Sequence, residues 1–225
     1  VVTKVGTGVR IDANGGTGGE AALSGTLDVT TADSATSVLV ETGTAATDVT
    51  GDSGSITVDA EELLEDTLLT LAGSSNIEVN TLIGDVNAGA QTGTLEVTTD
   101  DAPDDGIDVT TSAGATTINA DNVGNTITTD ATALADDTLL DLNGDSAFTV
   151  TGFKGNLEAD AGAGALSVTL ADASDIRLDV GRAASVNASG LSDDNTLELA
   201  GSGDVTVTNL AGDVDANINL GTYAG

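Results

Sequence analysis

The sequence predicts an all-β chain, and within that class a parallel β-solenoid (β-helix) built from three imperfect repeats. Short segments of alternating apolar and polar residues recur along the chain, separated by Gly, Asp, Asn and Ser. One long stretch of sequence occurs three times with variations, which indicates an array of repeated structural units. Aromatic residues make up 1% of the chain, so a thin core of stacked small side chains is favoured over a thick globular core.

The repeated stretch occupies residues 67–88, 138–159 and 195–216, which we call the first, second and third copies. Each copy has two alternating apolar pairs, a large apolar residue and a shorter third pair, with glycines between them. The equivalent leucines Leu71, Leu142 and Leu199 show that the second interval is shorter than the first. The equivalent glycines after the first pair are Gly73, Gly144 and Gly201.

Two shorter sequence motifs, which we call words, each occur three times and indicate the same repeat. GTLDVTT at 25–31 returns as GTLEVTT at 93–99 and GALSVTL at 164–170. A V/T-x-A-x-x-L word occurs at 58–63, 129–134 and 186–191. The third repeat has lost a piece between these two words, which accounts for the shorter second interval. An array tolerates such a loss because each unit contacts only its neighbours.

These words divide the chain into an entry strand with a Gly-rich loop at 1–21 and one array at 22–225. The repeats of the array cover about 22–92, 93–163 and 164–225. Ala60–Asp66 is the one candidate for a single helical turn. The alternative architecture is a row of tandem small β-sandwiches, which would need about seven strands per ~100 residues and usually a buried Trp or Tyr. Repeats that are shorter than this and contain no Trp favour the solenoid.

The charge balance restricts the partners of the chain. Five Lys and Arg stand against 37 Asp and Glu, for a net charge of −32. Nucleic acid and anionic membrane surfaces need clustered cations, so both are excluded as partners. No apolar run approaches the length of a membrane span, and membrane insertion is not expected. The partners that remain are divalent cations and further copies of the chain.

The absence of Cys and His excludes disulfides and every catalytic arrangement that depends on a thiolate or an imidazole. Parallel β-helices do include polysaccharide lyases, but three aromatic residues and five cations leave little to hold an acidic sugar. No cluster of candidate catalytic residues interrupts the repeats, as we would expect for an active site. We therefore expect a protein that is not an enzyme and assign no catalytic residue.

The acidic turns are the candidate sites, with calcium as the candidate ligand, since calcium takes six to eight carboxylate and carbonyl oxygens. One candidate is the DDAPDDGID segment; the other is the acidic pair that precedes each copy. The candidate ligands are Asp100, Asp101, Asp104, Asp105, Asp108, Asp66, Asp137 and Asp194. The spacing does not match the D-x-D-x-D-G loop, and aspartate also commonly begins a turn before a strand.

The T-x-T words at 126–128 and 206–208 predict outward threonines on a β face. Ice binding would need many such words in register, and we expect that the other segments do not repeat them.

The words GTLEVTT, SVNASGL and the third copy resemble the repetitive regions of secreted bacterial surface proteins. These are the giant adhesins and S-layer-like proteins of Gram-negative bacteria, which often carry calcium-binding RTX repeats and leave the cell by type I secretion. The resemblance covers nearly all of the chain, but the RTX nonapeptide is nowhere intact. It implies a structural role at the bacterial cell surface or outside the cell.

From these observations we expect a structural stalk, coat or filament element that associates end to end or is a segment of a longer solenoid. The alternative is an adhesin module stiffened by calcium, and a polysaccharide-acting enzyme ranks below both.

Overall fold

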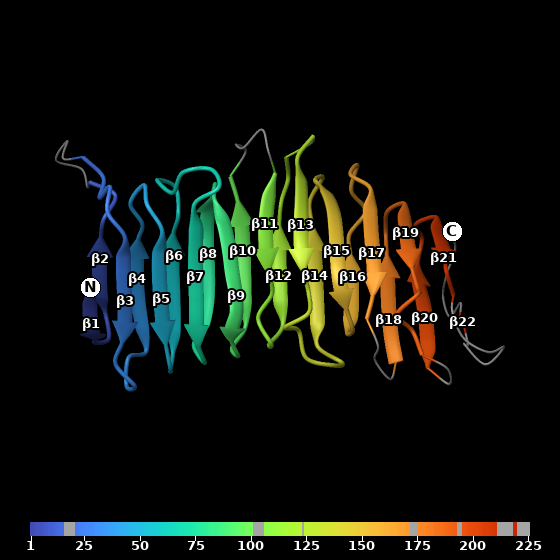
Figure 1. The fold of residues 1–225 in the computed structure, drawn as a ribbon, viewed down its shortest axis with the longest axis horizontal. Coiled ribbons are helices and arrows are strands. Elements are labelled where there is room, and N and C mark those ends of the chain that lie inside the picture. The colour runs from blue at the N-terminus through green and yellow to red at the C-terminus, as the bar shows by residue number, and fades with distance from the viewer. Residues whose placement is uncertain are drawn as a thin grey trace.

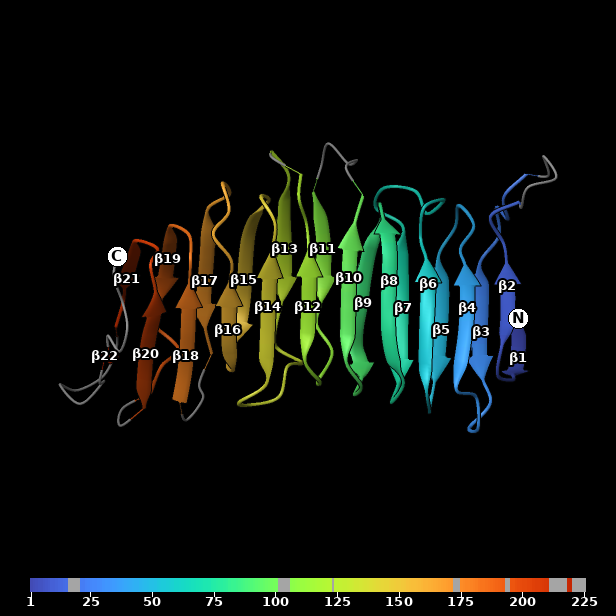
Figure 2. The same cartoon turned by 180° about the vertical axis from the view of Figure 1, so that it is seen from behind.

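The chain is an all-β solenoid in which two parallel sheets lie face to face (Figures 1 and 2). The structure, a computed structural model, describes residues 1–15, 21–100, 106–122, 124–171, 175–192, 195–210 and 218–219. These residues contain no helix, and their strands enter the two sheets alternately. All strand pairs are parallel, which confirms the predicted β-solenoid, and the alternative of tandem sandwiches is wrong.

Each sheet has 11 strands in the order of the sequence. Sheet A contains β1 (Val2–Val5), β3 (Leu27–Thr31), β5 (Thr47–Gly51), β7 (Leu68–Gly73), β9 (Asp85–Gln91), β11 (Ile107–Thr110), β13 (Thr126–Asp130), β15 (Ala147–Phe153), β17 (Leu166–Leu170), β19 (Ala184–Asn187) and β21 (Val205–Thr208). Sheet B contains β2 (Val9–Asp12), β4 (Ser37–Glu41), β6 (Ser55–Asp59), β8 (Asn76–Leu82), β10 (Leu95–Thr99), β12 (Thr116–Asn119), β14 (Leu139–Asn143), β16 (Asn156–Ala159), β18 (Asp175–Val180), β20 (Thr196–Gly201) and β22 (Ile218–Asn219).

One coil of the solenoid therefore contributes one strand to each sheet. Coil length varies: on sheet B a long coil leads from Thr116 to its partner Leu140, and a short one leads from Leu140 to its partner Leu157. The coils stack along the long axis, so β1 and β21 lie at opposite ends of the molecule (Figure 1). β1 and β2 pair with β3 and β4, so the entry segment begins the same two sheets.

The core is the space between the two sheets, and it is filled by the inward side chains of the alternating pattern. In β3, for example, Leu27 and Val29 are buried and Asp28 is exposed. The inward ladders are mostly Val, Leu, Ile and Ala, and among the described residues the buried aromatic side chains are Phe148 and Phe153. Each fully buried Val or Leu contributes about 1.5–3 kcal/mol. The period-two pattern thus fixes both the strands and the face that each strand buries.

The sequence repeat and the structural repeat differ in length. The first copy begins on β7 in sheet A, whereas the second copy begins on β14 in sheet B. The interval between them spans seven strands, or three and a half coils, so these copies begin on opposite sheets. The shorter interval from the second copy to the third spans six strands, from β14 to β20, and returns to the same sheet. The piece missing from the third repeat therefore corresponds to one strand, which is half a coil.

The copies keep the same backbone conformation even where they lie on opposite sheets. Gly73, Gly144 and Gly201 have φ values of 98°, 97° and 96°. A Cβ at Gly73 would overlap the carbonyl oxygen of Gly51 in the neighbouring coil. These glycines let the chain leave a strand while the coils stay in close contact.

The segment Ala60–Asp66, the candidate for a helical turn, is not helical. It forms two consecutive tight turns, in which the amide of Leu63 donates to Ala60 and the amide of Thr67 donates to Leu64. Leu63 is fully buried under this loop, as is the equivalent Leu134 before the second copy, and Leu191 before the third copy is also buried. The V/T-x-A-x-x-L segment therefore forms a loop, and its buried leucine holds the loop against the solenoid.

Candidate cation site and buried polar contacts

The DDAPDDGID segment connects sheet B to sheet A, between β10 and β11. Asp101, Asp104 and Asp105 lie outside the described residues. The amide of Asp100 donates to the carbonyl of Leu82 at 2.9 Å. Asp108 lies on the outward face of β11 and is exposed.

Asp85, which the sequence analysis did not single out, interacts electrostatically with two of the predicted ligands, Asp66 and Asp108. Its carboxylate accepts a hydrogen bond of 2.9 Å from the amide of Asp108. Burial raises the pKa of Asp85, and the charges of Asp108 and Asp66 raise it further, against the lowering effect of that hydrogen bond. The structure therefore brings Asp66 and Asp108 into electrostatic contact with a third, partly buried carboxylate.

This arrangement is not repeated in the second copy. The residue equivalent to Asp85 is the neutral Asn156, whose side-chain amide donates to the carbonyl of Asp137 at 3.0 Å. In Figure 1 the loop before β7, which contains Asp66, lies at the upper edge of the solenoid, and the loop before β14, which contains Asp137, lies at the lower edge. These two acidic residues therefore do not stack.

Asp66 and Asp137 share a conformation instead, with φ values of 56° and 60°. Both side chains are exposed. Aspartate tolerates this left-handed region better than most residues, so each residue closes a tight turn before the strand that follows. Asp194, the third equivalent residue, lies outside the described residues. Within the described ranges, no group of three or more acidic side chains is close enough to hold a metal ion.

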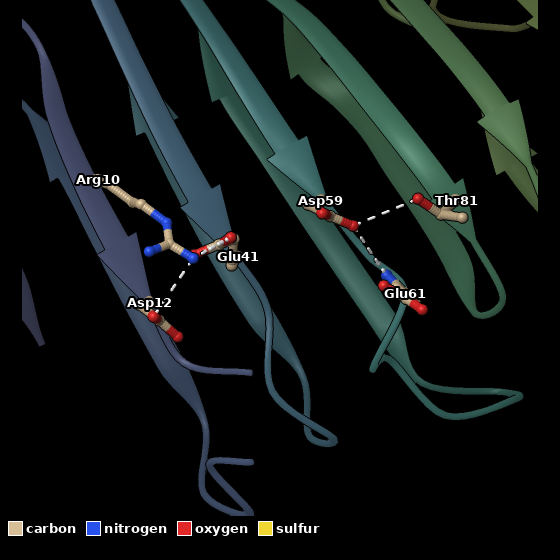
Figure 3. A network of polar contacts seen from close by, with 6 residues as sticks. All are labelled: Arg10, Asp12, Glu41, Asp59, Glu61 and Thr81. Carbon is tan, nitrogen blue, oxygen red and sulfur yellow. Dashed lines mark hydrogen bonds and ion pairs between the residues drawn. The ribbon is translucent and has the colours of Figure 1, made fainter. Parts of the chain in front are cut away.

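Arg10 connects the first two strands of sheet B (Figure 3). Its guanidinium contacts Glu41 Oε1 at 2.5 Å and Asp12 at 3.4 Å. The hydrogen bond to Glu41 raises the pKa of Arg10, and the charges of Glu41 and Asp12 raise it further, against the lowering effect of burial. Asp12, Glu41 and Asp59 stand in register on consecutive strands, so Arg10 offsets the repulsion within a stacked acidic column.

Asp59 continues this column on β6, where no cation contacts it in the part of the chain that the structure describes. It accepts hydrogen bonds of 3.3 Å from the amide of Glu61 and from the hydroxyl of Thr81 (Figure 3). Glu61 lies in the turn after β6, and Thr81 lies near the end of β8. The carboxylate of Asp59 therefore links the turn after β6 to the end of β8 at the edge of the solenoid.

Arg182 is a buried charged residue that sequence reasoning missed, since it was counted only as one of five cations. It is 2% exposed. Its guanidinium donates to the carbonyls of Gly144 at 2.6 Å, Asp160 at 2.7 Å and Ser146 at 3.1 Å. It also lies 5.3 Å from the centre of the Phe148 ring.

These contacts connect the β18–β19 turn to two earlier turns on the same edge of the solenoid. Burial lowers the pKa of Arg182, and the nearby carboxylates of Asp145 and Asp160 act in the opposite direction. Three backbone acceptors and an aromatic ring thus replace the water around a buried cation. This is structural chemistry, and it leaves Arg182 enclosed within the turns.

Comparison with known proteins gives no match: no family model, no curated protein and no solved structure matches the chain. In the described residues, no helix is long and apolar enough to cross a bilayer.

Proposed function

We propose that this chain is a structural element of a bacterial surface or extracellular matrix, where it acts as a stalk, coat or filament unit that associates end to end. The observation that carries the proposal is the pair of unbroken parallel sheets. Every described inner strand hydrogen-bonds to a neighbour on both sides, whereas β1 and β2 each have one partner strand. Such an edge accepts a further strand through backbone hydrogen bonds.

The first coil also exposes apolar side chains at this edge. Val2 and Val9 are 36% and 40% exposed, and Val1 is 89% exposed. A coil that is stacked against them would bury these side chains as the inner coils bury theirs. The placement outside the cell rests on the resemblance of the repeated words to secreted bacterial surface proteins.

The proposal assigns no catalytic role to the chain. Four of its five cations have structural contacts. Arg182 binds backbone carbonyls, Arg10 contacts Glu41, Arg177 contacts Asp179 at 2.9 Å, and Lys154 lies 3.9 Å from Asp136. A sugar-acid substrate would have to compete for these groups.

Electron microscopy of the purified chain tests end-to-end association. We expect filaments whose length grows with protein concentration. Introducing Val2→Asp together with Val9→Asp should shorten them to single particles, because charges would then have to be buried at the junction. Leu64→Asp is the matched control, since Leu64 is 58% exposed on a loop away from this edge. Single particles from the unmodified chain at high concentration would contradict the proposal.

Calcium is the second candidate, and the observation that favours it is the electrostatic effect of Asp66 and Asp108 on Asp85. Because no three of the described acidic side chains are close enough to form a site by themselves, backbone carbonyls and water would have to supply further ligands. If a cation stiffens the chain, calcium in the millimolar range should raise the melting temperature, since extracellular modules bind at roughly 10⁻⁴–10⁻³ M. Asp85→Asn should remove that shift. In chelator the same variant should be more stable than the parent at neutral pH, because the fold disfavours the charged form of Asp85. Equal melting temperatures in calcium and chelator would exclude the stiffening role.

A further inference from the structure

The outward face of sheet A changes in character along the solenoid. In its first two-thirds, five strands each present an outward aspartate: Asp28, Asp48, Asp85, Asp108 and Asp130. From β15 to β21 the described outward positions hold no ionisable side chain. These positions, which we call the hydroxyl face, are Thr149, Thr151, Ser167, Thr169, Ser185, Asn187, Thr206 and Thr208. A neutral face is unusual in a chain with a net charge of −32.

The hydroxyl groups of this face stand in register. The strand pairing aligns Thr128, Thr149, Ser167, Ser185 and Thr206 in one column across five consecutive strands of sheet A. Neighbouring members of such a column lie about 4.8 Å apart. The T-x-T word at 206–208 begins with the last member of this column, and the word at 126–128 ends with its first member, because Thr128 pairs with Thr149. The expectation that the other segments do not repeat such words was wrong, because TVT occurs at 149–151 and the related SVT at 167–169 and SVN at 185–187 follow it in register.

The opposite face over the same coils is acidic. On sheet B the outward column runs through Asp141, Glu158 and Asp179 in register. Arg177 lies between two of these carboxylates, 2.9 Å from Asp179 and 3.9 Å from Glu158. The C-terminal coils therefore have one neutral hydroxyl side and one strongly negative side.

We propose that the hydroxyl face is a lateral contact surface for the same face of a second copy of this chain; this rests on the proposed structural function and deepens it. Two copies with this charge repel each other over most of their surface, and the repulsion is smallest where neither carries a charge. Hydroxyl groups both donate and accept, so one face is complementary to itself across a two-fold axis.

The area of the hydroxyl face limits the strength of a single lateral contact. Four strands at about 4.8 Å spacing and about five residues of about 3.3 Å each span roughly 300 Å². A stable pair usually buries about 800 Å² on each partner. A single lateral contact is therefore weak, and it holds when end-to-end association repeats it along two filaments. Side-by-side pairing should accordingly increase with filament length and with salt, which screens the remaining repulsion.

Single cysteines locate the contact, because the chain contains none of its own. Ser185→Cys places a thiol on the hydroxyl face, and Ser37→Cys places one at an exposed position of β4 in sheet B. A short bis-maleimide should cross-link the Ser185→Cys chain into dimers at least about tenfold faster than the Ser37→Cys chain at raised salt. Equal rates would overturn the proposal.

A charge variant tests the same surface by a second route. Ser167→Asp with Ser185→Asp should abolish side-by-side pairs in electron micrographs while single filaments persist. Ser37→Asp with Ser55→Asp adds the same charge on sheet B and should leave the pairs intact. Pairs that survive the first variant would contradict the lateral contact. Shaping of ice crystals by a chain that never self-associates would also overturn it, with ordered water as the partner of the face.

The two proposals fail in different ways. Long filaments without cross-linking at Ser185→Cys would remove the lateral contact and keep end-to-end association. Single particles that still cross-link through that cysteine would remove end-to-end association and keep the lateral contact.

Discussion

The first and second copies form the same turn by different means, and the comparison shows what the repeat requires. In the first copy the carbonyl of Ser75 accepts a hydrogen bond of 2.6 Å from the side-chain amide of Gln91. In the second copy the equivalent carbonyl, that of Ser146, accepts from the Arg182 guanidinium at 3.1 Å. The position equivalent to Gln91 is Gly162, and a Cβ there would meet this guanidinium.

This difference indicates that the turn requires a hydrogen-bond donor to its carbonyl, and that different residues can supply this donor. Gln91 comes from the next strand of the same sequence repeat, whereas Arg182 comes from a turn much further along the chain. A buried carbonyl without a donor costs about 1–3 kcal/mol, which is consistent with the presence of a donor in both of these copies. Because neighbouring coils contribute to one turn, a donor can come from a later coil.

Removing the arginine should have the largest effect. Arg182→Met leaves one buried and two partly buried carbonyls without this donor, and we expect a loss of at least about 3 kcal/mol in the free energy of unfolding. Denaturant-induced unfolding measures this loss. The matched control is Arg177→Met, whose partly exposed ion pairs should contribute less than about 1 kcal/mol. Similar losses in the two variants would show that the buried contacts of Arg182 carry little stability.

The glycine after the first strand should matter equally in both copies. Gly73→Ala and Gly144→Ala each place a Cβ against a backbone carbonyl and a side chain, at φ values of 98° and 97°. We expect about 2 kcal/mol of destabilisation from each change, by thermal or denaturant unfolding. Gly25→Ala is the control, because a Cβ there meets nothing within 4 Å. A large difference between the first two variants would mean that the two sheets are not equivalent.

Removing the glutamine should cost less than removing the arginine. Gln91→Leu fills a similar volume but removes the side-chain donor to the carbonyl of Ser75, whereas the carbonyl of Thr94 keeps the hydrogen bond from the amide of Ile77. The glutamine's own Oε1 already has no partner, which reduces the net loss. We expect about 1–2 kcal/mol of destabilisation, measured by denaturant-induced unfolding. If Gln91→Leu proved neutral, water would have to replace the amide in this turn.

The smallest effect should be a gain in stability. Thr81, Gly152 and Asn209 occupy equivalent positions with φ values of 55°, 68° and 53°. A β-branched residue is strained in this region, whereas Asn and Gly adopt it readily. Thr81→Asn should therefore stabilise the chain by about 0.5–1 kcal/mol in thermal unfolding. The new amide can replace the hydrogen bond of Thr81 to Asp59, as Asn209 does by donating to Asn187 at 3.2 Å.

A matched control separates relief of strain from a general effect of asparagine. Thr128→Asn changes an outward residue inside a regular strand and should be neutral or slightly destabilising. A gain in stability from both variants would argue against backbone strain at Thr81.

The sequence by itself determined the strands, their buried faces and the solenoid. Alternation such as that of Leu27, Asp28 and Val29 is a local signal, and each strand carries its own copy of it. The repeated words also located the turns, and the absence of Trp argued against sandwiches. The acidic segments were visible too, but their spacing could not show that Asp66 and Asp108 flank Asp85.

Only the tertiary structure decided which residues meet across coils. Whether a copy falls on sheet A or sheet B depends on counting every intervening strand, and an interval of seven strands reverses the sheet. The contact from Arg182 to Ser146 and the column from Thr128 to Thr206 join residues several turns apart. Local periodicity contains no information about such contacts, because they depend on the stacking of whole coils.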